Sequence, residues 1–158
     1  MPIDRQMVIN GWSLFAHPMF LQELEYLEKQ VAKLKKKDPE NYKKKNITKR
    51  LAAINTLVFE NIPKEPGAAL YKQGGTLGDE HRHWYRAKFF QQYRLFFRFH
   101  TESKIIVYAW VNDEGNKRAY DSKTDAYKVF EKMLKNGNPP DGWDELLFEA
   151  KNLKVYKP

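Results

Sequence analysis

The first half of the chain carries apolar residues at the spacing of amphipathic helices. From Met19, apolar side chains recur at steps of three and four residues, which places them on one face of a helix. This series is Phe20, Leu24, Leu27, Val31 and Leu34, and it runs into Lys35, Lys36 and Lys37, cations that suit the negative end of a helix dipole. A second series stops before Pro63 and consists of Ile47, Leu51, Ile54 and Val58. Because the joint between them is short, the two helices are predicted to form an antiparallel hairpin over about residues 18–62.

Shorter signals mark the borders of this hairpin. The segment from Val8 to Phe15 alternates loosely between apolar and polar residues and predicts one short strand, ended by His17-Pro18. Asp38-Pro39 is typical of a helix N-cap followed by proline at the first helical position, so it predicts the start of the second helix. Residues 63–80 hold several prolines and glycines and predict a loop.

The hydrophobic period changes in the second half, where three runs are rich in β-branched and aromatic residues. These runs are Trp84 to Phe90, Gln92 to Phe99 and Lys104 to Val111. Leu95 to Phe97 and Ile105 to Val107 are apolar on both faces, as in the middle of a covered sheet. Ser122 or Thr124 is expected to cap a further helix, and a last short helix is expected to begin near Trp143.

The order of these elements predicts an α+β fold. We expect one mostly antiparallel sheet at about residues 84–112, with the helical hairpin packed on one face and C-terminal helices at about residues 122–152. The chain has 158 residues, which fits a single domain over residues 1–158.

Composition narrows the classes of function. The chain has 28 Lys and Arg against 20 Asp and Glu, a formal net charge of +8, and 15% aromatic residues. Cations pair with phosphates and rings stack on bases, which favours nucleic acid; the alternative is that excess lysine only keeps the protein soluble. The lack of cysteine excludes disulfides, zinc–thiolate sites, iron–sulfur clusters and cysteine nucleophiles. Without a signal peptide or a long apolar run, we expect a cytoplasmic protein with no membrane partner.

Two neighbouring predicted strands carry cations at alternate positions. Residues two apart on a strand point the same way, so these cations share a face if the strands pair as a hairpin. The set is Arg86, Lys88, Arg94 and Arg98, with Trp84 and Phe96 on the same sides of their strands. Like charges side by side destabilise a sheet, so we expect a functional basic face that the helices leave uncovered. The alternative is a solvated outer face whose long side chains lie over aromatic rings.

The remaining clusters of polar residues are weaker indications of function. Lysines and arginines from Lys33 to Arg50 lie around the helix joint, where solvated surface is the favoured interpretation and phosphate contact the alternative. The segment Asp79 to His83 resembles a metal site only weakly, and no metal or other cofactor is expected. His81, His83 and His100 are expected to be surface histidines, although they could supply an acid–base pair. His17, beside an apolar run, is expected to be structural.

Cleavage of RNA requires neither a metal ion nor histidine, because the substrate carries its own nucleophile, the 2′-hydroxyl. A protein must align that hydroxyl with the phosphate, take its proton, stabilise the phosphoryl oxygens and protonate the leaving 5′-oxygen. Lysine or tyrosine can transfer protons and arginine can hold the phosphate. A face with Arg86, Lys88 and Arg94 beside a tyrosine is chemically sufficient.

Several blocks of the sequence resemble the YhaV family of toxins. They are Asn10-Gly11-Trp12, Ala16-His17-Pro18, the segment Lys37 to Tyr42, the segment Tyr93 to Arg98, the segment Trp110 to Glu114, and Lys123 to Tyr127 followed by Val129-Phe130. The similarity extends from about Asn10 to Trp143. It implies a type II toxin–antitoxin module, a RelE-like fold and an endoribonuclease that acts on mRNA in association with translation. It also implies neutralisation by a PrlF-type antitoxin, whose swapped-hairpin fold binds operator DNA.

The resemblance also implies roles for single residues. In RelE-like toxins a tyrosine precedes two cations on one strand, as in Tyr85-Arg86-Ala87-Lys88, and the next strand opens with Tyr-Arg, as in Tyr93-Arg94. A later arginine is matched by Arg118 and a tyrosine of the terminal helix by Tyr127. Lys123 and Asp125 belong to the YhaV-like block, with either catalytic or capping roles.

These considerations give a hypothesis for the site. Arg86 and Arg94 would hold the scissile phosphate, Lys88 or Tyr127 would accept the proton of the 2′-hydroxyl, and Arg118 or Lys123 would lie near the leaving oxygen. Base stacking and further contacts to RNA would come from Trp84, Phe96 and Arg98. Two alternatives are a ParE-like toxin that inhibits gyrase by binding it, and an RNA-binding protein without catalysis.

Overall fold

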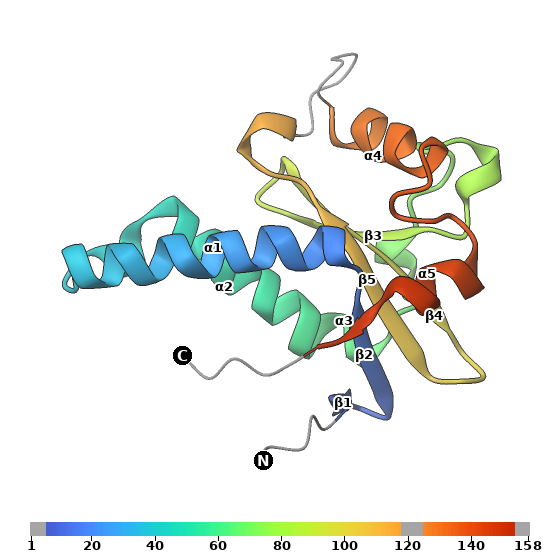
Figure 1. Cartoon of the computed structure of the whole chain (residues 1–158), viewed down its shortest axis with the longest axis horizontal. Helices are drawn as coiled ribbons and strands as arrows, with labels where there is room; N and C mark the ends of the chain where they lie inside the picture. Colours follow the sequence, from blue (N-terminus) through green and yellow to red (C-terminus); the bar gives the residue numbers. More distant parts are fainter. Residues whose placement is uncertain (1–5, 118–124, 154–158) are drawn as a thin grey trace.

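In the computed structural model, which describes residues 6–117 and 125–153, a sheet lies between two helical layers (Figure 1). The strands are β1 (Val8–Ile9), β2 (Trp12–Ala16), β3 (Tyr85–Phe89), β4 (Tyr93–His100), β5 (Ile105–Val111) and β6 (Lys151–Asn152). The helices are α1 (Pro18–Lys37), α2 (Asn46–Thr56), α3 (Ile62–Lys64), α4 (Ala126–Lys135) and α5 (Trp143–Glu149). The predicted α+β class is confirmed.

The sheet has the strand order β1-β2-β5-β4-β3, and β6 pairs with β2. Its pairs are antiparallel except for β2 with β5, which run parallel, so the prediction of a mostly antiparallel sheet is confirmed. Parallel neighbours need a long crossover, and here the helical hairpin lies in the chain between them. No helix of the described residues is long and apolar enough to cross a membrane.

The N-terminal segment differs from the single strand predicted for Val8 to Phe15. It forms the antiparallel pair β1 and β2, because the chain turns at Asn10 and Gly11. Both turn residues have positive φ, 51° and 82°, a conformation that asparagine and glycine adopt more readily than other residues.

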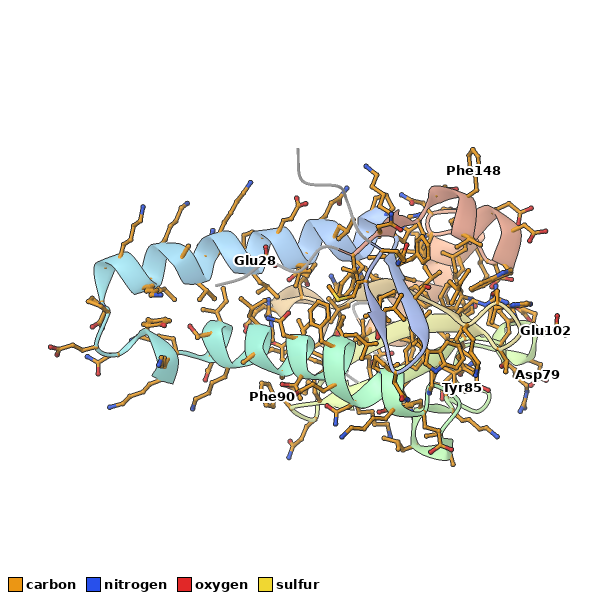
Figure 2. The ribbon with its side chains drawn as sticks, turned by 90° about the horizontal axis from the view of Figure 1, so that it is seen from below. Glu28, Asp79, Tyr85, Phe90, Glu102 and Phe148 are labelled. Atoms are coloured by element: carbon orange, nitrogen blue, oxygen red, sulfur yellow. The ribbon has the colours of Figure 1, made fainter. Side chains whose placement is uncertain are left out.

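The helical hairpin is confirmed, although both the start and the end of its second half differ from the prediction. Figure 2 shows α1 and α2 side by side, with their connecting segment projecting away from the sheet. Asp38 caps the C-terminus of α1 through its backbone N–H, and α2 begins only at Asn46, so the predicted start at Asp38-Pro39 is wrong. A π-helical turn at Leu57–Asn61 carries the chain on into α3, which includes Pro63, so the predicted end before Pro63 is also wrong.

His17 explains where α1 starts. Its ring Nδ1 accepts a hydrogen bond from the backbone N–H of Met19, and Pro18 occupies the first helical position. The side chain is buried, and its Nε2 lies 3.0 Å from a carboxylate oxygen of Glu149 in α5. The structural role predicted for this histidine is confirmed.

Each face of the sheet carries its own apolar core. Beneath the hairpin, side chains of α1 and α2 pack with alternate residues of β4 and β5, including Leu95, Phe97, Ile106 and Tyr108. On the other face, Phe96 and Val107 pack with residues of α4 and α5 such as Phe130 and Leu146. The face that carries the predicted cations is therefore covered by helices, contrary to the prediction.

A β-bulge in β5 builds the centre of this second core. Phe97 pairs with Tyr108 while Phe96 pairs with Trp110, so Ala109 is an extra residue and Trp110 joins the face of Phe96. Phe130 of α4 stacks on both of these rings, with centroid distances of 4.2 Å to Phe96 and 5.7 Å to Trp110. These contacts fix the position of α4 above the sheet.

Candidate active site

The candidate active site centres on Tyr127, in the first turn of α4. Its phenol oxygen accepts hydrogen bonds from the Nε of Arg86 at 2.9 Å and from the Nε of Arg94 at 3.2 Å. These arginines come from the paired strands β3 and β4, so the contact joins both strands to the helix. The structure brings together three of the residues that the sequence predicted for the site.

Both arginines are almost completely buried, with 8% of Arg86 and 6% of Arg94 exposed. One terminal nitrogen of Arg86 donates to the carbonyl of Leu70 at 2.8 Å. The corresponding nitrogen of Arg94 donates to the carbonyls of Gln91 and Tyr93 at 2.7 and 2.9 Å. Nη2 of each arginine has no acceptor among the described residues, so each guanidinium keeps a donor group available.

No carboxylate of the described residues forms an ion pair with Arg86 or Arg94; their acceptors are a phenol and backbone carbonyls. Arg50 shows the contrast, since this equally buried arginine is paired with Glu23 at 3.0 Å and with Glu114 at 3.6 Å. Buried charges are normally compensated by an opposite charge. Two neighbouring buried guanidinium groups without a carboxylate favour an anion as their ligand.

The sequence around Tyr127 holds this side chain rigidly. Asp125 is the N-cap of α4, and its carboxylate accepts from the backbone N–H of Tyr127 at 3.1 Å. The expected caps, Ser122 and Thr124, are therefore not the N-cap and lie outside the described residues. The Tyr127 ring meets the face of Phe96 edge-on, with centroids 5.5 Å apart. Packing and capping together aim the phenol at the two arginines.

Lys88 is the exposed member of the predicted set. It pairs with Arg94 across β3 and β4, and it lies two residues from Arg86 on the same strand, so the three cations share one face. The two further residues assigned to the leaving oxygen, Arg118 and Lys123, lie outside the described residues.

The predicted stacking of bases on Trp84 and Phe96 is wrong, because both side chains have no exposed surface and belong to the core beneath α4. Arg98 also has a structural environment. Its guanidinium carbon lies 5.6 Å from the centre of the Trp84 ring and 5.5 Å from that of Trp143, and Nη1 donates to the carbonyl of Asp141 at 2.7 Å. These contacts account for the position of the Arg98 side chain within the protein, so its place in the fold does not depend on the predicted contact with RNA.

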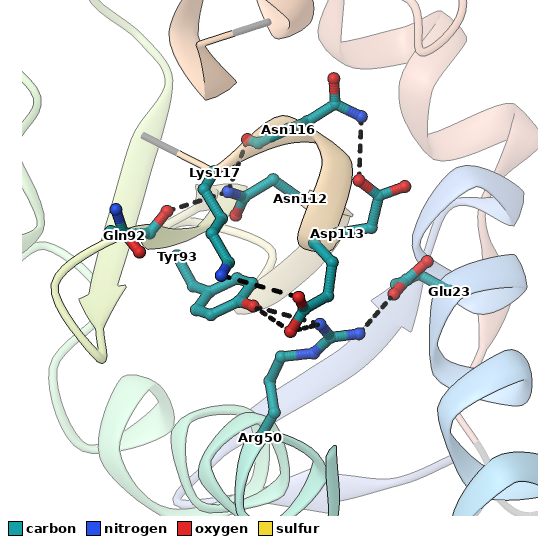
Figure 3. Close-up of polar contacts among 9 residues, drawn as sticks. Glu23, Arg50, Gln92, Tyr93, Asn112, Asp113, Asn116 and Lys117 are labelled. Atoms are coloured by element: carbon teal, nitrogen blue, oxygen red, sulfur yellow. Dashed lines mark hydrogen bonds and ion pairs between the residues drawn. The ribbon is translucent and has the colours of Figure 1, made fainter. Parts of the chain in front are cut away.

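Asn112 supports the site and was not predicted as a functional residue. Its amide oxygen accepts from the backbone N–H of Arg94 at 2.7 Å. Figure 3 shows its Nδ2 donating to the carbonyls of Gln92 and Asn116. The side chain thereby ties the start of β4 to the turn after β5. A buried asparagine directly after an apolar strand was the available signal, within the block Trp110 to Glu114.

Arg50 forms a second polar cluster, between the helical hairpin and this turn (Figure 3). Its Nη1 donates to the hydroxyl of Tyr93 at 3.3 Å, and that hydroxyl donates to Glu114 at 3.0 Å. Burial raises the pKa of Glu23 to about 7, although the charge of Arg50 lowers it and that of Asp113 adds to the rise. A hollow of about 290 Å³ beside this cluster is lined in part by Lys49, Arg50, Tyr93 and Lys117.

One group of side chains has the chemistry of a metal site. His81, His83 and Asp141 each offer a ligand atom, and these atoms lie within 4.8 Å of one another. His81 is buried, so its predicted place on the surface is wrong, while His83 is half-buried. The group is separate from the hydrogen bonds around Tyr127.

The sequence comparisons identify the family of this chain. Residues 14–151 match the family model of a toxin with endonuclease activity, of a toxin–antitoxin system, the YhaV toxins. Toxin YhaV of Escherichia coli O6:H1 and ribonuclease toxin YhaV of Escherichia coli K12 are each 44% identical over 144 residues, which cover 90% of this chain and 94% of theirs. Among solved structures, a chain of the toxin–antitoxin complex RelBE2 from Mycobacterium tuberculosis aligns with a TM-score of 0.44 and 20% identity, over 70% of this chain and 98% of that one.

Proposed function

Because the chain belongs to the YhaV family of toxins with endonuclease activity, we propose that it cleaves mRNA without a metal ion and uses the 2′-hydroxyl of the substrate as the nucleophile. The family is one of toxin–antitoxin systems, so an antitoxin is its partner. The finer proposals are that the antitoxin is of the PrlF type, that cleavage accompanies translation on the ribosome, and that the protein acts in the cytoplasm. They rest on the resemblance to the family.

The observation that carries the proposal is the pair of buried arginines, Arg86 and Arg94, to which the described residues offer no carboxylate partner. A phosphodiester supplies the missing negative charge, and its oxygens can accept from the Nη2 groups of Arg86 and Arg94. Arginine recognises phosphate through its planar fork of donors. Preorganised donors of this kind stabilise charge that develops on the phosphoryl oxygens, typically by ~3–4 kcal/mol for each donor.

In the proposed reaction, the 2′-oxygen forms a bond to phosphorus while the bond from phosphorus to the 5′-oxygen breaks. The proton of the 2′-hydroxyl passes to a base, and the leaving 5′-oxygen receives a proton. The products are a 2′,3′-cyclic phosphate and a 5′-hydroxyl. This proposed step consumes no water and requires no metal ion or redox partner.

Lys88 is the better proposed acceptor of the 2′-hydroxyl proton. It is exposed and lies on the same face as the two arginines, whereas Tyr127 is buried and its oxygen already accepts two N–H donors. Tyr127 is thus a positioning residue in this proposal, which orients Arg86 and Arg94 toward the phosphate. Arg118 and Lys123 remain the proposed donors near the leaving oxygen.

End mapping in a bacterial translation extract tests the proposal. A reporter mRNA is incubated with wild-type protein, with Arg94→Ala, or with wild type after a block of translation initiation, and both new ends are analysed chemically. We expect cyclic-phosphate and 5′-hydroxyl ends, a loss of roughly 10²–10³-fold in rate for Arg94→Ala, and no cleavage under the block. Arg82→Ala is the matched control, because Arg82 is exposed and pairs only with Asp79 among the described residues.

Three results would overturn parts of the proposal. New ends with a 5′-phosphate would show attack by water and so exclude the 2′-hydroxyl mechanism. Wild-type rates for folded Arg94→Ala would remove this arginine from the site. If no lane contains cuts although the protein is folded and toxic, inhibition of DNA supercoiling by purified gyrase would support the ParE-like alternative instead.

A further inference from the structure

The loop before β3 and the segment between α4 and α5 meet at one carboxylate. Oδ1 of Asp141 lies 3.0 Å from Nδ1 of His81, 2.8 Å from Nε2 of His83 and 2.7 Å from Nε1 of Trp84. About 60 residues of chain separate Asp141 from these partners, so the cluster could not be recognised from local spacing.

Two imidazoles and one carboxylate are a typical set of ligands for a divalent transition metal such as Zn²⁺. The three ligand atoms lie within 4.8 Å of one another. Around a tetrahedral zinc ion, ligand atoms bound at 2.0–2.1 Å are about 3.3 Å apart. The separations of 3.0 and 2.8 Å from Asp141 to the two histidines are slightly shorter than this value, and all three atoms lie within 4.8 Å of one another, so shifts of the side chains would bring them to the spacing around an ion.

The surroundings fix the carboxylate in place. The indole N–H of Trp84, a side chain in the core, donates to it, and the guanidinium of Arg98 holds the backbone carbonyl of Asp141 at 2.7 Å. Ordered metal sites characteristically orient their ligands through such outer hydrogen bonds. His81 is buried, whereas about a third of the side chains of His83 and Asp141 is exposed, which leaves a path for an ion and room for water as a fourth ligand.

We propose that His81, His83 and Asp141 bind one divalent transition-metal ion, such as Zn²⁺, which fastens the segment between α4 and α5 to the entry of β3. The ion has a structural role and takes no part in the reaction at Arg86 and Arg94. Failure of the zinc site would therefore leave the proposed nuclease chemistry unaffected, and failure of the nuclease proposal would leave the zinc site unaffected. Without an ion, His81, His83 and Trp84 hold the Asp141 carboxylate through hydrogen bonds alone, an arrangement we call the hydrogen-bonded clamp.

Zinc binding by the full, untagged chain tests the site. The protein is stripped with a chelator, desalted, and titrated with Zn²⁺ in a calorimeter, while its melting temperature is followed with and without the ion. We expect saturation at one ion per chain and a higher melting temperature, since an ion that binds only the folded state stabilises it. Cobalt offers a second readout on wild type alone, as visible absorption bands that Zn²⁺ abolishes.

His83→Gln is the decisive variant, because its side chain is partly exposed and the folded state can be verified by circular dichroism. We expect His83→Gln and Asp141→Asn to weaken zinc binding at least about 100-fold. Asp79→Asn, an exposed carboxylate in the same loop, should bind like wild type. A wild-type titration without saturation, absent cobalt bands, or unchanged binding by folded His83→Gln would each overturn the site and leave the hydrogen-bonded clamp.

Discussion

The phenol oxygen of Tyr127 lies 2.9 Å from Nε of Arg86, and this hydrogen bond joins the first turn of α4 to an edge strand of the sheet. The same oxygen accepts from Arg94 on the neighbouring strand. A neutral acceptor orients the two guanidinium groups without cancelling their charge. The charge therefore remains available to a phosphate, which a carboxylate at the same position would not allow.

Replacing Tyr127 by phenylalanine should separate positioning from packing. Tyr127→Phe keeps the ring that meets Phe96 but removes the only acceptor that the described residues offer to both Nε groups. We expect a folded protein that is about 1–3 kcal/mol less stable and cleaves mRNA roughly 10²-fold more slowly. Chemical denaturation and end mapping measure these two effects.

Tyr85→Phe is the control for this prediction. Tyr85 likewise packs against aromatic rings, although it is half-buried where Tyr127 is buried, and its hydroxyl has no hydrogen bond among the described residues. It should retain nearly wild-type cleavage. An equal loss of rate in both variants would mean that the phenol of Tyr127 does not position the arginines.

Lys88→Arg should abolish cleavage almost as completely as Lys88→Ala. Arginine keeps the positive charge but does not release its proton in proteins, so it cannot act as a base. If Lys88 accepts the proton of the 2′-hydroxyl, we expect both variants to lose about 10²–10⁴-fold in rate. The measurement is single-turnover cleavage of the mapped mRNA, with Lys72→Arg, an exposed lysine outside the site, as the control.

Activity that is retained in Lys88→Arg but lost in Lys88→Ala would indicate a different role for Lys88. In that case Lys88 would supply charge to the phosphate, and the proton would pass to another group. Activity retained in both variants would exclude Lys88 from the reaction.

The three strands β3, β4 and β5 could be predicted from the sequence because period-two patterns are local. Alternation along β3 and β4 placed Arg86, Lys88 and Arg94 on one face, and the register agrees. What covers that face is a tertiary property. The β-bulge at Ala109 turns Trp110 toward Phe96, and α4 packs on the resulting aromatic surface. Neither the bulge nor this packing can be predicted from a local sequence pattern.

Other differences come from contacts that the local composition does not specify. Asp38-Pro39 has the composition of an N-cap, yet the backbone N–H of Asp38 closes the last turn of α1 by bonding to the carbonyl of Leu34. Asp141 meets His81 only because α4 folds back over the sheet. Arg50 looked like one member of a solvated lysine-rich segment, but it is buried between Glu23 and Tyr93.

Asn112→Ala should weaken the fold at the edge of the site. The substitution removes one acceptor and two donor interactions of a buried amide, and it leaves the backbone N–H of Arg94 without its partner. We expect a loss of about 2–3 kcal/mol in the free energy of unfolding, measured in urea. Asn116→Ala, in the same turn, should lose much less, because the side chain of Asn116 bonds only to Asp113 among the described residues. Equal losses would show that Asn112 contributes no more to stability than its half-buried neighbour Asn116.

The pH dependence of stability should report on Glu23. Its pKa lies at about 7 in the folded protein, mainly through burial, against an ordinary value of 4.5. Between these values the unfolded chain loses this proton while the folded chain keeps it, so stability should fall as pH rises from about 4.5 to 7 and then level off. Glu23→Gln does not titrate, so its decline over this range should be smaller by about 1 kcal/mol, since water screens a partly exposed group.

Urea unfolding at intervals from pH 4.5 to 8 measures this difference for wild type, Glu23→Gln and Glu25→Gln. Glu25 is exposed on the same helix, so its variant should follow the wild-type curve and correct for the general effect of net charge. Parallel curves for wild type and Glu23→Gln would show that Glu23 is ionised throughout. Arg50 would then hold a full ion pair, because its attraction for the carboxylate would outweigh the burial that opposes it.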